Sequence, residues 1–205
     1  MISRRTLIAA AAAGFLIAGQ APGSAAAAEP AATVQRFYDV LLSAMKDGPK
    51  LGFAGRRDRM APAVEGEFDM PLMTRLVVGP EWQSFTPSQQ QQVIAAFTDF
   101  SVANYASQFD DYSGEKFVVD PKASSAPGSD VIVHTKLLQT NDKPVQLDYL
   151  LREVQGKWRI IDVYLSGTVS QLAARRSEFS SILRRDGVQG LISTLKRKTQ
   201  QLASG

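Results

Sequence analysis

The sequence contains no cysteine and only one histidine, His134. Without cysteine the chain has no disulfides, thiolate metal ligands or thiol nucleophiles, so packing alone must stabilise its fold. A Ser/His/Asp triad would need His134, but strand alternation places that side chain on a polar face, where a solvated histidine is the usual finding. The sequence also lacks a Gly-rich phosphate loop and a G-x-S-x-G elbow. We therefore predict no catalytic residue and no cofactor.

Clustered metal ligands are missing as well. Metal sites in proteins are usually built from several His, Cys or carboxylate side chains that lie close together. The tightest acidic pair in the chain, Asp110-Asp111, has the composition of an ordinary turn. We predict no metal site.

Long apolar runs are scarce, and the one near the N-terminus has the flanks of a cleaved signal peptide. Residues 1–5 are basic, residues 7–18 are apolar, and residues 25–28 offer a small-residue cleavage site. The run is too short for a membrane span. Residues 3–7 fit a twin-arginine export signal, and an ordinary Sec signal that holds two arginines fits equally.

We therefore expect residues 1–28 to be a signal peptide and residues 29–205 to form one exported domain, periplasmic in a bacterium. The remaining chain is long enough for a single hydrophobic core. Removal of Arg4 and Arg5 lowers the formal net charge of +3 by two. The near-neutral balance that is left gives no reason to expect nucleic-acid binding.

The clearest structural pattern is a predicted hairpin. Residues 145–154 and 157–165 are rich in β-branched and aromatic side chains and are separated only by Gln155-Gly156. Residues 116–119 and 131–138 predict two further strands. Apolar and polar side chains alternate along these strands, as in an antiparallel sheet with one wet face. Because residues 158–165 are apolar on both faces, we place that strand centrally.

Helical patterns cover most of the rest of the chain. Thr86-Pro87-Ser88-Gln89 is typical of a capped helix start, and the helix is expected to reach Phe109. Apolar spacing predicts further helices over 29–44, 68–78 and 168–183, and a last one from Val188 after a stop at 184–187. Glycine and proline predict irregular structure over 46–67, with residues 56–59 as solvated surface.

These patterns predict an α+β fold in which helices cover an antiparallel sheet of about four strands. The covering segments are rich in large apolar side chains and poor in reactive ones, which indicates a container rather than a catalyst. Ordinary core packing explains any one of these side chains, but together they form the candidate lining of that container. The set is Phe68, Leu72, Met73, Leu76, Val77, Val93, Phe97, Phe100, Val133, Leu147, Tyr149, Leu151, Trp158 and Ile160.

Asp162 is the one carboxylate inside an apolar strand. Buried acids are usually paired, and we expect Arg176 on the following helix to form a structural pair with it. Two other functions stay open. One is a small isomerase or hydratase that uses Asp162 with Tyr105 or Tyr149. The other is a structural adaptor of an envelope complex whose interior is filled by side chains.

The order of several residues resembles the MlaC / toluene-tolerance family of periplasmic lipid-binding proteins. The first half carries Phe68-Asp69, Met73, Leu76-Val77-Val78-Gly79, Trp82, Thr86-Pro87, Gln90, Phe97 and Tyr105. The second half carries Tyr149, Gly156-Lys157-Trp158, Asp162-Val163, Gly167, Arg176-Ser177-Glu178-Phe179, Gly187 and Leu191-Ile192. Within the family, residues 165–172 and 174–179 look most like the hopanoid-associated HpnM branch. Met70-Pro71 departs from the family pattern.

The resemblance implies a curved sheet wrapped by helices, with an apolar cavity for acyl chains between them. It also implies a soluble carrier of phospholipid or hopanoid, which maintains the lipid asymmetry of the outer membrane. The implied partners are an inner-membrane ABC transporter with a lipid-binding substrate-handling subunit, and an outer-membrane lipoprotein.

Overall fold

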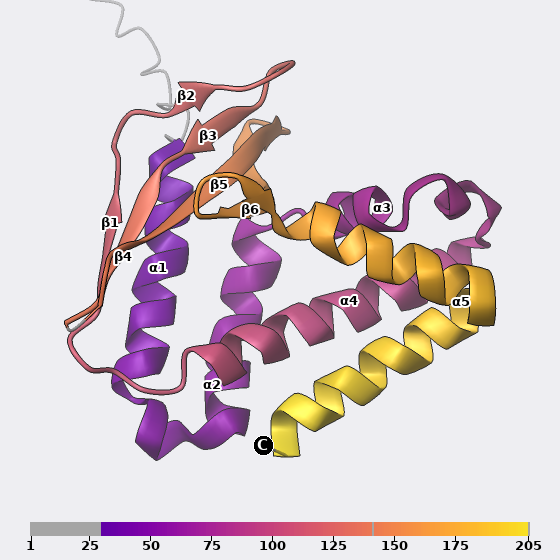
Figure 1. Cartoon of the computed structure of the whole chain (residues 1–205), viewed down its shortest axis with the longest axis horizontal. Coiled ribbons are helices and arrows are strands. Elements are labelled where there is room, and N and C mark those ends of the chain that lie inside the picture. Colours follow the sequence, from indigo (N-terminus) through magenta and orange to yellow (C-terminus); the bar gives the residue numbers. More distant parts are fainter. Residues whose placement is uncertain (1–29, 141, 205) are drawn as a thin grey trace, which may run out of the picture.

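The computed structural model describes residues 30–140 and 142–204, so the predicted signal peptide lies outside the described residues. Within them, helices cover one side of an antiparallel sheet (Figure 1). The predicted fold class, an α+β fold with helices over an antiparallel sheet, is confirmed.

The sheet is built on the predicted hairpin, β5 (Val145–Val154) and β6 (Lys157–Leu165). Gln155 and Gly156, which connect the strands, have φ of 52° and 75°. Positive φ at both positions is what a two-residue type I′ turn requires, and this turn matches the twist of the flanking strands.

The other edge of β5 pairs with a strand that is broken at His134. The predicted strand over 131–138 is divided into β3 (Val131–Val133) and β4 (Thr135–Leu138), which pair with different parts of β5. The strand β1 (Lys116–Val119) adds to β4, and the short β2 (Ser124–Ser125) adds to β3. The break separates a half of the strand that pairs with β1 from a half that pairs with β2, and α1 runs beside both (Figure 1).

The predicted central position of β6 is wrong. One edge of β6 pairs with β5, and the other edge meets only β7 (Val169–Ser170) and a single bridge between Phe68 and Ile160. Ile160 and Ile161 are nevertheless buried on opposite faces of the strand. An apolar strand therefore lies at the edge because neighbouring segments, rather than further long strands, cover it.

The helices are α1 (Pro30–Lys46), α2 (Gly48–Glu67), α3 (Met70–Val78), the 3₁₀ helix η1 (Gly79–Ser84), α4 (Pro87–Gln108) and α5 (Gln171–Ser204). The start of α4 is as predicted: Thr86 accepts a hydrogen bond from the Gln89 amide, and the Gln89 side chain accepts one from the Thr86 amide. The predicted start of α3 at Phe68 is two residues early, because Asp69 is the cap and its carboxylate accepts from the Leu72 amide.

The predicted irregular segment over 46–67 is wrong, because α2 spans most of it. The breaking signals Gly52 and Pro62 lie inside the helix, where Gly52 forms a kink at φ 61°. Buried Met60 and Val64 bind the helix to the core, and that packing overrides the local preference. Arg56, predicted to be solvated, is buried and donates to the carbonyls of Ala106 and Gly48.

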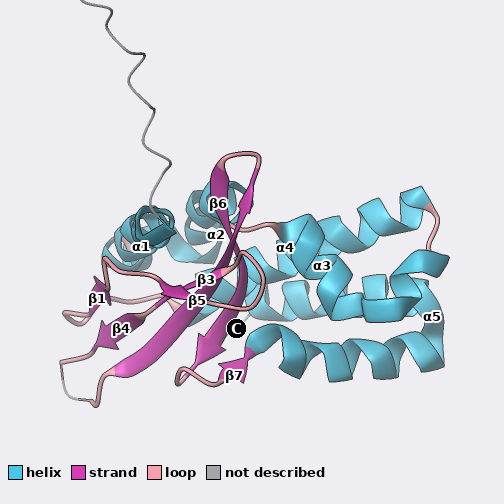
Figure 2. Cartoon of the chain, turned by 90° about the horizontal axis from the view of Figure 1, so that it is seen from above, coloured by secondary structure: helices cyan, strands magenta, loops and turns pink. Residues whose placement is uncertain are grey.

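The last helix, α5, begins three residues later than predicted and folds back on itself. Ser166 and Gly167, with φ of 53° and 72°, form a second tight turn that pairs Val169–Ser170 with β6 before the helix starts. At Gly187 the backbone has φ 65° and ψ −170°, and the two arms of α5 lie on either side of this break (Figure 1). Figure 2 shows α1 and α2 packed beside the sheet, while α3, α4 and α5 extend beyond it.

We expect Gly187→Ala to lower the free energy of unfolding by about 1–3 kcal/mol, because this conformation is essentially restricted to glycine. The matched control is Gly66→Ala in α2, which lies at an exposed helical position without positive φ. A Cβ added at either glycine has no heavy atom within 4 Å. The control should therefore gain roughly 0.4–1 kcal/mol. Urea unfolding measures the free energy of unfolding of both variants. Equal effects at the two sites would contradict a strained backbone at position 187.

Candidate functional site

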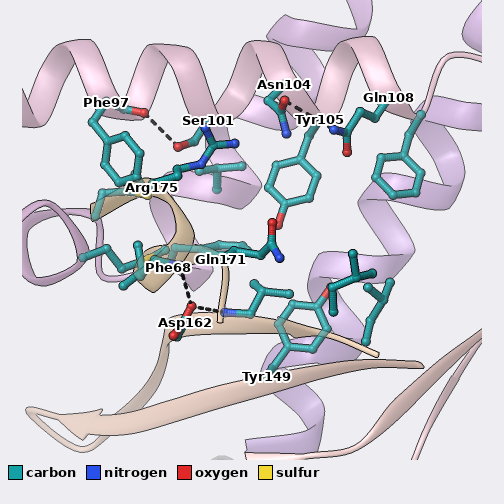
Figure 3. Close-up of a pocket in the computed structure, with 18 residues that line it drawn as sticks. Phe68, Phe97, Ser101, Asn104, Tyr105, Gln108, Tyr149, Asp162, Gln171 and Arg175 are labelled. Atoms are coloured by element: carbon teal, nitrogen blue, oxygen red, sulfur yellow. Dashed lines mark hydrogen bonds between the residues drawn. The ribbon is translucent and has the colours of Figure 1, made fainter. Parts of the chain in front are cut away.

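A partly enclosed cavity of about 240 Å³ lies between the sheet and the helices (Figure 3). Its walls come from β5, β6, α4, the start of α5, and the end of α2 with the segment that leads from it into α3. The lining residues are Val64, Phe68, Met70, Met73, Phe97, Ser101, Asn104, Tyr105, Gln108, Phe109, Leu147, Tyr149, Asp162, Val163, Leu165, Gln171, Leu172 and Arg175.

The volume sets the size of a possible ligand. A cavity of about 150 Å³ holds one benzene molecule, so the 240 Å³ of this cavity has room for roughly ten carbon atoms. The described conformation therefore accommodates part of one acyl chain, and a whole lipid would need further opening.

The structure brings only part of the predicted lining together at this cavity. Phe68, Met73, Phe97, Leu147 and Tyr149 line it. The remaining predicted residues lie elsewhere: Val77, Val93, Phe100, Val133, Leu151 and Ile160 are buried in the core, Leu72 and Trp158 are partly exposed, and Leu76 is 42% exposed.

Sequence reasoning missed the polar part of the lining. Ser101, Asn104 and Gln108 project from α4, and Gln171 and Arg175 project from the first turns of α5. The three α4 residues follow Phe97 at spacings of four, three and four. They therefore lie on the same face of α4 as Phe97, and none of them carries a charge. An uncharged polar stripe that extends an apolar one was the signal that could have found them.

Asp162 lines the cavity, but its oxygens are already occupied. Its carboxylate accepts hydrogen bonds from the Ser170 hydroxyl, from the Leu172 amide at 3.1 Å and from the Val163 amide at 2.7 Å. The Ser170 and Leu172 donors lie at the start of α5 and the Val163 donor lies in β6, and together they stabilise the carboxylate in place of a cation.

The predicted pair of Asp162 with Arg176 is wrong. In the described part of the chain the two side chains form no ion pair, and the Arg176 guanidinium instead lies against Gly79, at the end of α3. The start of α5 explains the difference. The Ser170 hydroxyl and the Leu172 amide lie next to the Asp162 carboxylate and bind it, whereas Arg176 lies more than one turn further along the helix.

His134 is not simply a solvated surface residue, as the sequence had suggested. Its Nε2 lies 2.9 Å from the Ser124 hydroxyl and its Nδ1 lies 2.9 Å from Asp148 Oδ2. Asp148 is only 3% exposed and also accepts from the Gln146 amide group. Asp148 alternates along β5 with the lining residues Leu147 and Tyr149. The hydrogen-bonded group of Ser124, His134 and Asp148 therefore lies on the opposite face of the sheet from the cavity.

Three tyrosines cluster beside and within the cavity. Burial raises the pKa of Tyr38 to about 12, and burial also raises the pKa of Tyr105 and Tyr149 above the ordinary value. Each phenol is therefore protonated near neutral pH and can donate a hydrogen bond but cannot act as a base.

Among residues 30–140 and 142–204, no helix combines the length and apolar character that crossing a bilayer requires. The same residues contain no group of three or more His, Asp or Glu side chains placed to hold a metal ion.

Comparison with known proteins places the fold and the cavity in context. The model of a family described as MlaC protein matches residues 35–197. The chain is also similar to a phospholipid-binding protein from Ralstonia solanacearum that was solved in complex with a phospholipid, at 27% identity and a TM-score of 0.71. That match covers 86% of this chain and 99% of the other. The family match includes every residue that lines the cavity.

The buried tyrosines predict a loss of stability in alkali. The folded state holds the phenol protons more tightly than the unfolded chain, so this contribution is fully present below the ordinary pKa of about 10. It is lost as the pH rises from there, through about 12 for Tyr38. Each group contributes about 1.4 kcal/mol per pH unit within its window.

Tyr105→Phe, which removes one such group, should make the decline above pH 10 shallower by about that slope. Urea unfolding at a series of alkaline pH values measures the effect. An unchanged slope would mean that Tyr105 ionises equally well in the folded and unfolded chains.

Proposed function

The chain belongs to the MlaC family, and from that membership and the cavity we propose that it carries lipid through the periplasm. The observation that carries the proposal is the space enclosed between the sheet and the helices, with Phe68, Phe97, Leu147 and Tyr149 in its walls. The Ralstonia protein, similar over nearly its whole length, holds a phospholipid.

The energetics suit a carrier. Burying the roughly ten carbons of an acyl chain that the described cavity can hold yields about 8 kcal/mol before ordering costs, at ~0.8 kcal/mol per methylene. An apolar cavity supplies this without covalent chemistry. A lipid held in this way is shielded from water while it crosses an aqueous compartment, which is the physical task of a soluble carrier.

We further propose that the cargo moves between an inner-membrane ABC transporter and the outer membrane, where a lipoprotein receives or delivers it. The basis is the family resemblance together with the predicted signal peptide over residues 1–28. The cargo class is a phospholipid or a hopanoid, and resemblance to the HpnM branch is the argument for the second. The further inference below concerns this choice.

Two other functions are less well supported by the geometry. An isomerase that uses Asp162 needs a carboxylate free to accept a proton, but three donors already bind it. Its proposed partners Tyr105 and Tyr149 have raised pKa values because they are buried. A purely structural adaptor would fill its interior with side chains, whereas this protein has a cavity between the sheet and the helices.

Native mass spectrometry on the protein purified without detergent from its own host, followed by lipid extraction, tests the carrier function. We expect a bound lipid, either a phospholipid or a hopanoid, at about one molecule per chain. A protein that is free of lipid after gentle purification would contradict the carrier and favour an adaptor.

A variant pair tests the position of the binding site. Leu147→Trp fills the cavity and should strongly reduce the amount of retained lipid, while Leu150→Trp, on the opposite face of the same strand, should leave it unchanged. Phe97→Asp places a charge in the α4 wall of the same cavity and should abolish retention. Circular dichroism confirms that each variant is folded, and equal lipid content in Leu147→Trp and Leu150→Trp would place the site elsewhere.

A further inference from the structure

Arg175 is the one cationic side chain among the residues that line the cavity. It enters from the second turn of α5 and lies beside Ser101 and Phe97 of α4 (Figure 3). Its guanidinium lies over the Phe100 ring, with 4.7 Å from Cζ to the ring centroid. The ring fixes the position of the charge and leaves the N–H donors at its edge available.

The charge has no protein counter-ion within the described residues. No ion pair or hydrogen bond from the Arg175 side chain is formed there, although Asp162 lines the same cavity. Asp162 is occupied by its three donors, and Figure 3 shows it on the sheet side, away from the guanidinium. Glu178, one turn further along α5, is bound to Lys198.

The Arg175 side chain is partly buried, so its charge has lost part of its hydration. Burial lowers the pKa of Arg175, and this outweighs the opposing influence of Glu178 and Tyr105. Charges that lose water in a protein are normally paired, and a ligand anion is the group that can complete this site. The guanidinium fork matches the oxygens of a phosphate in a bidentate geometry.

The neighbouring side chains suit the rest of a polar group. Asn104, Gln108 and Gln171 line the same cavity with uncharged amides that both donate and accept. Phe68, Met73, Leu147 and Tyr149 form the apolar part. Apart from Asp162 and the tyrosines, the polar lining side chains all come from α4 and α5, whereas β5 and the segment from Phe68 to Met73 contribute mainly apolar ones. The cavity therefore offers both a polar region and an apolar region, as a lipid headgroup and chain require.

We propose that Arg175 binds the phosphate of a phospholipid headgroup, so that the cavity selects phosphate-bearing lipids over neutral ones. This inference rests on the proposed function as a lipid carrier and names its cargo class. A neutral polycyclic lipid would leave the guanidinium without a counter-ion. A phospholipid satisfies it while its acyl chain occupies the apolar region.

A competition between two lipids with identical acyl chains tests the proposal. Delipidated protein is incubated with equimolar dioleoylphosphatidylglycerol and dioleoylglycerol in dilute non-ionic detergent micelles, and native mass spectrometry gives the ratio of the two bound lipids. The wild type should select the phospholipid. Arg175→Gln should lower the ratio by about 10- to 100-fold, the usual effect of losing a charged hydrogen bond, and Arg175→Lys should lower it less.

The matched control is Arg176→Gln, which removes the same charge from the next position, where the guanidinium lies against Gly79 outside the cavity. It should keep the wild-type ratio. Equal ratios in the wild type and Arg175→Gln, with lipid still bound, would overturn the phosphate site and leave the carrier intact. Failure of the wild type to bind either lipid would overturn the carrier itself.

Two further arms separate the phospholipid from other anions. Glycerol 3-phosphate in excess should not displace the phospholipid, because it lacks the acyl chain. Displacement would assign the site to a free phosphate compound and overturn the lipid headgroup. Palmitate that binds as tightly as the phospholipid, with the same dependence on Arg175, would assign the site to a carboxylate and also overturn the proposal.

Discussion

Contacts between aromatic rings around Phe37 hold the sheet and the helices together. Phe37 on α1 packs edge-on against Phe68 at 4.9 Å and Tyr105 at 5.0 Å between ring centroids, and it lies 6.4 Å from Tyr149. Those three partners come from the segment between α2 and α3, from α4 and from β5, and all three also line the cavity. The same rings therefore form the core on one side and the wall of the cavity on the other. Large, rigid side chains locked against one another resist collapse into the space beside them.

A second constraint acts at the start of α5, where Asp162 determines how the helix enters the fold. The carboxylate binds the Ser170 hydroxyl and the Leu172 amide, so it fixes the first turn of the helix against β6. Arg175 follows one turn later and is thereby directed into the cavity. The acid that the sequence predicted to pair with Arg176 thus has a positioning role instead. The buried carboxylate of Asp162 orients the turn that carries the partly buried Arg175.

The larger elements of the fold could be predicted from the sequence because their signals are local. The hairpin over 145–165 depends on Gln155-Gly156, and the start of α4 depends on Thr86 and Gln89, all within a few residues of what they control. The failures arose where distant contacts override local preference. Burial of Met60 and Val64 keeps α2 helical in spite of Gly52 and Pro62. Phe68 joins the edge of β6 instead of a helix because Ile160 lies beside it.

The sequence by itself determined the alternation of elements, the absence of thiol chemistry and the family, because these depend on residue types and their order. The tertiary structure alone decided which side chains line a cavity. Val93 and Phe97 share one apolar stripe on α4, and both are buried. Val93 is packed in the core, whereas Phe97 lines the cavity. Arg175 and Arg176 are adjacent and chemically identical, but only Arg175 enters the cavity. A cavity is space left between elements that meet from distant parts of the chain, so periodicity within one element cannot specify its boundary.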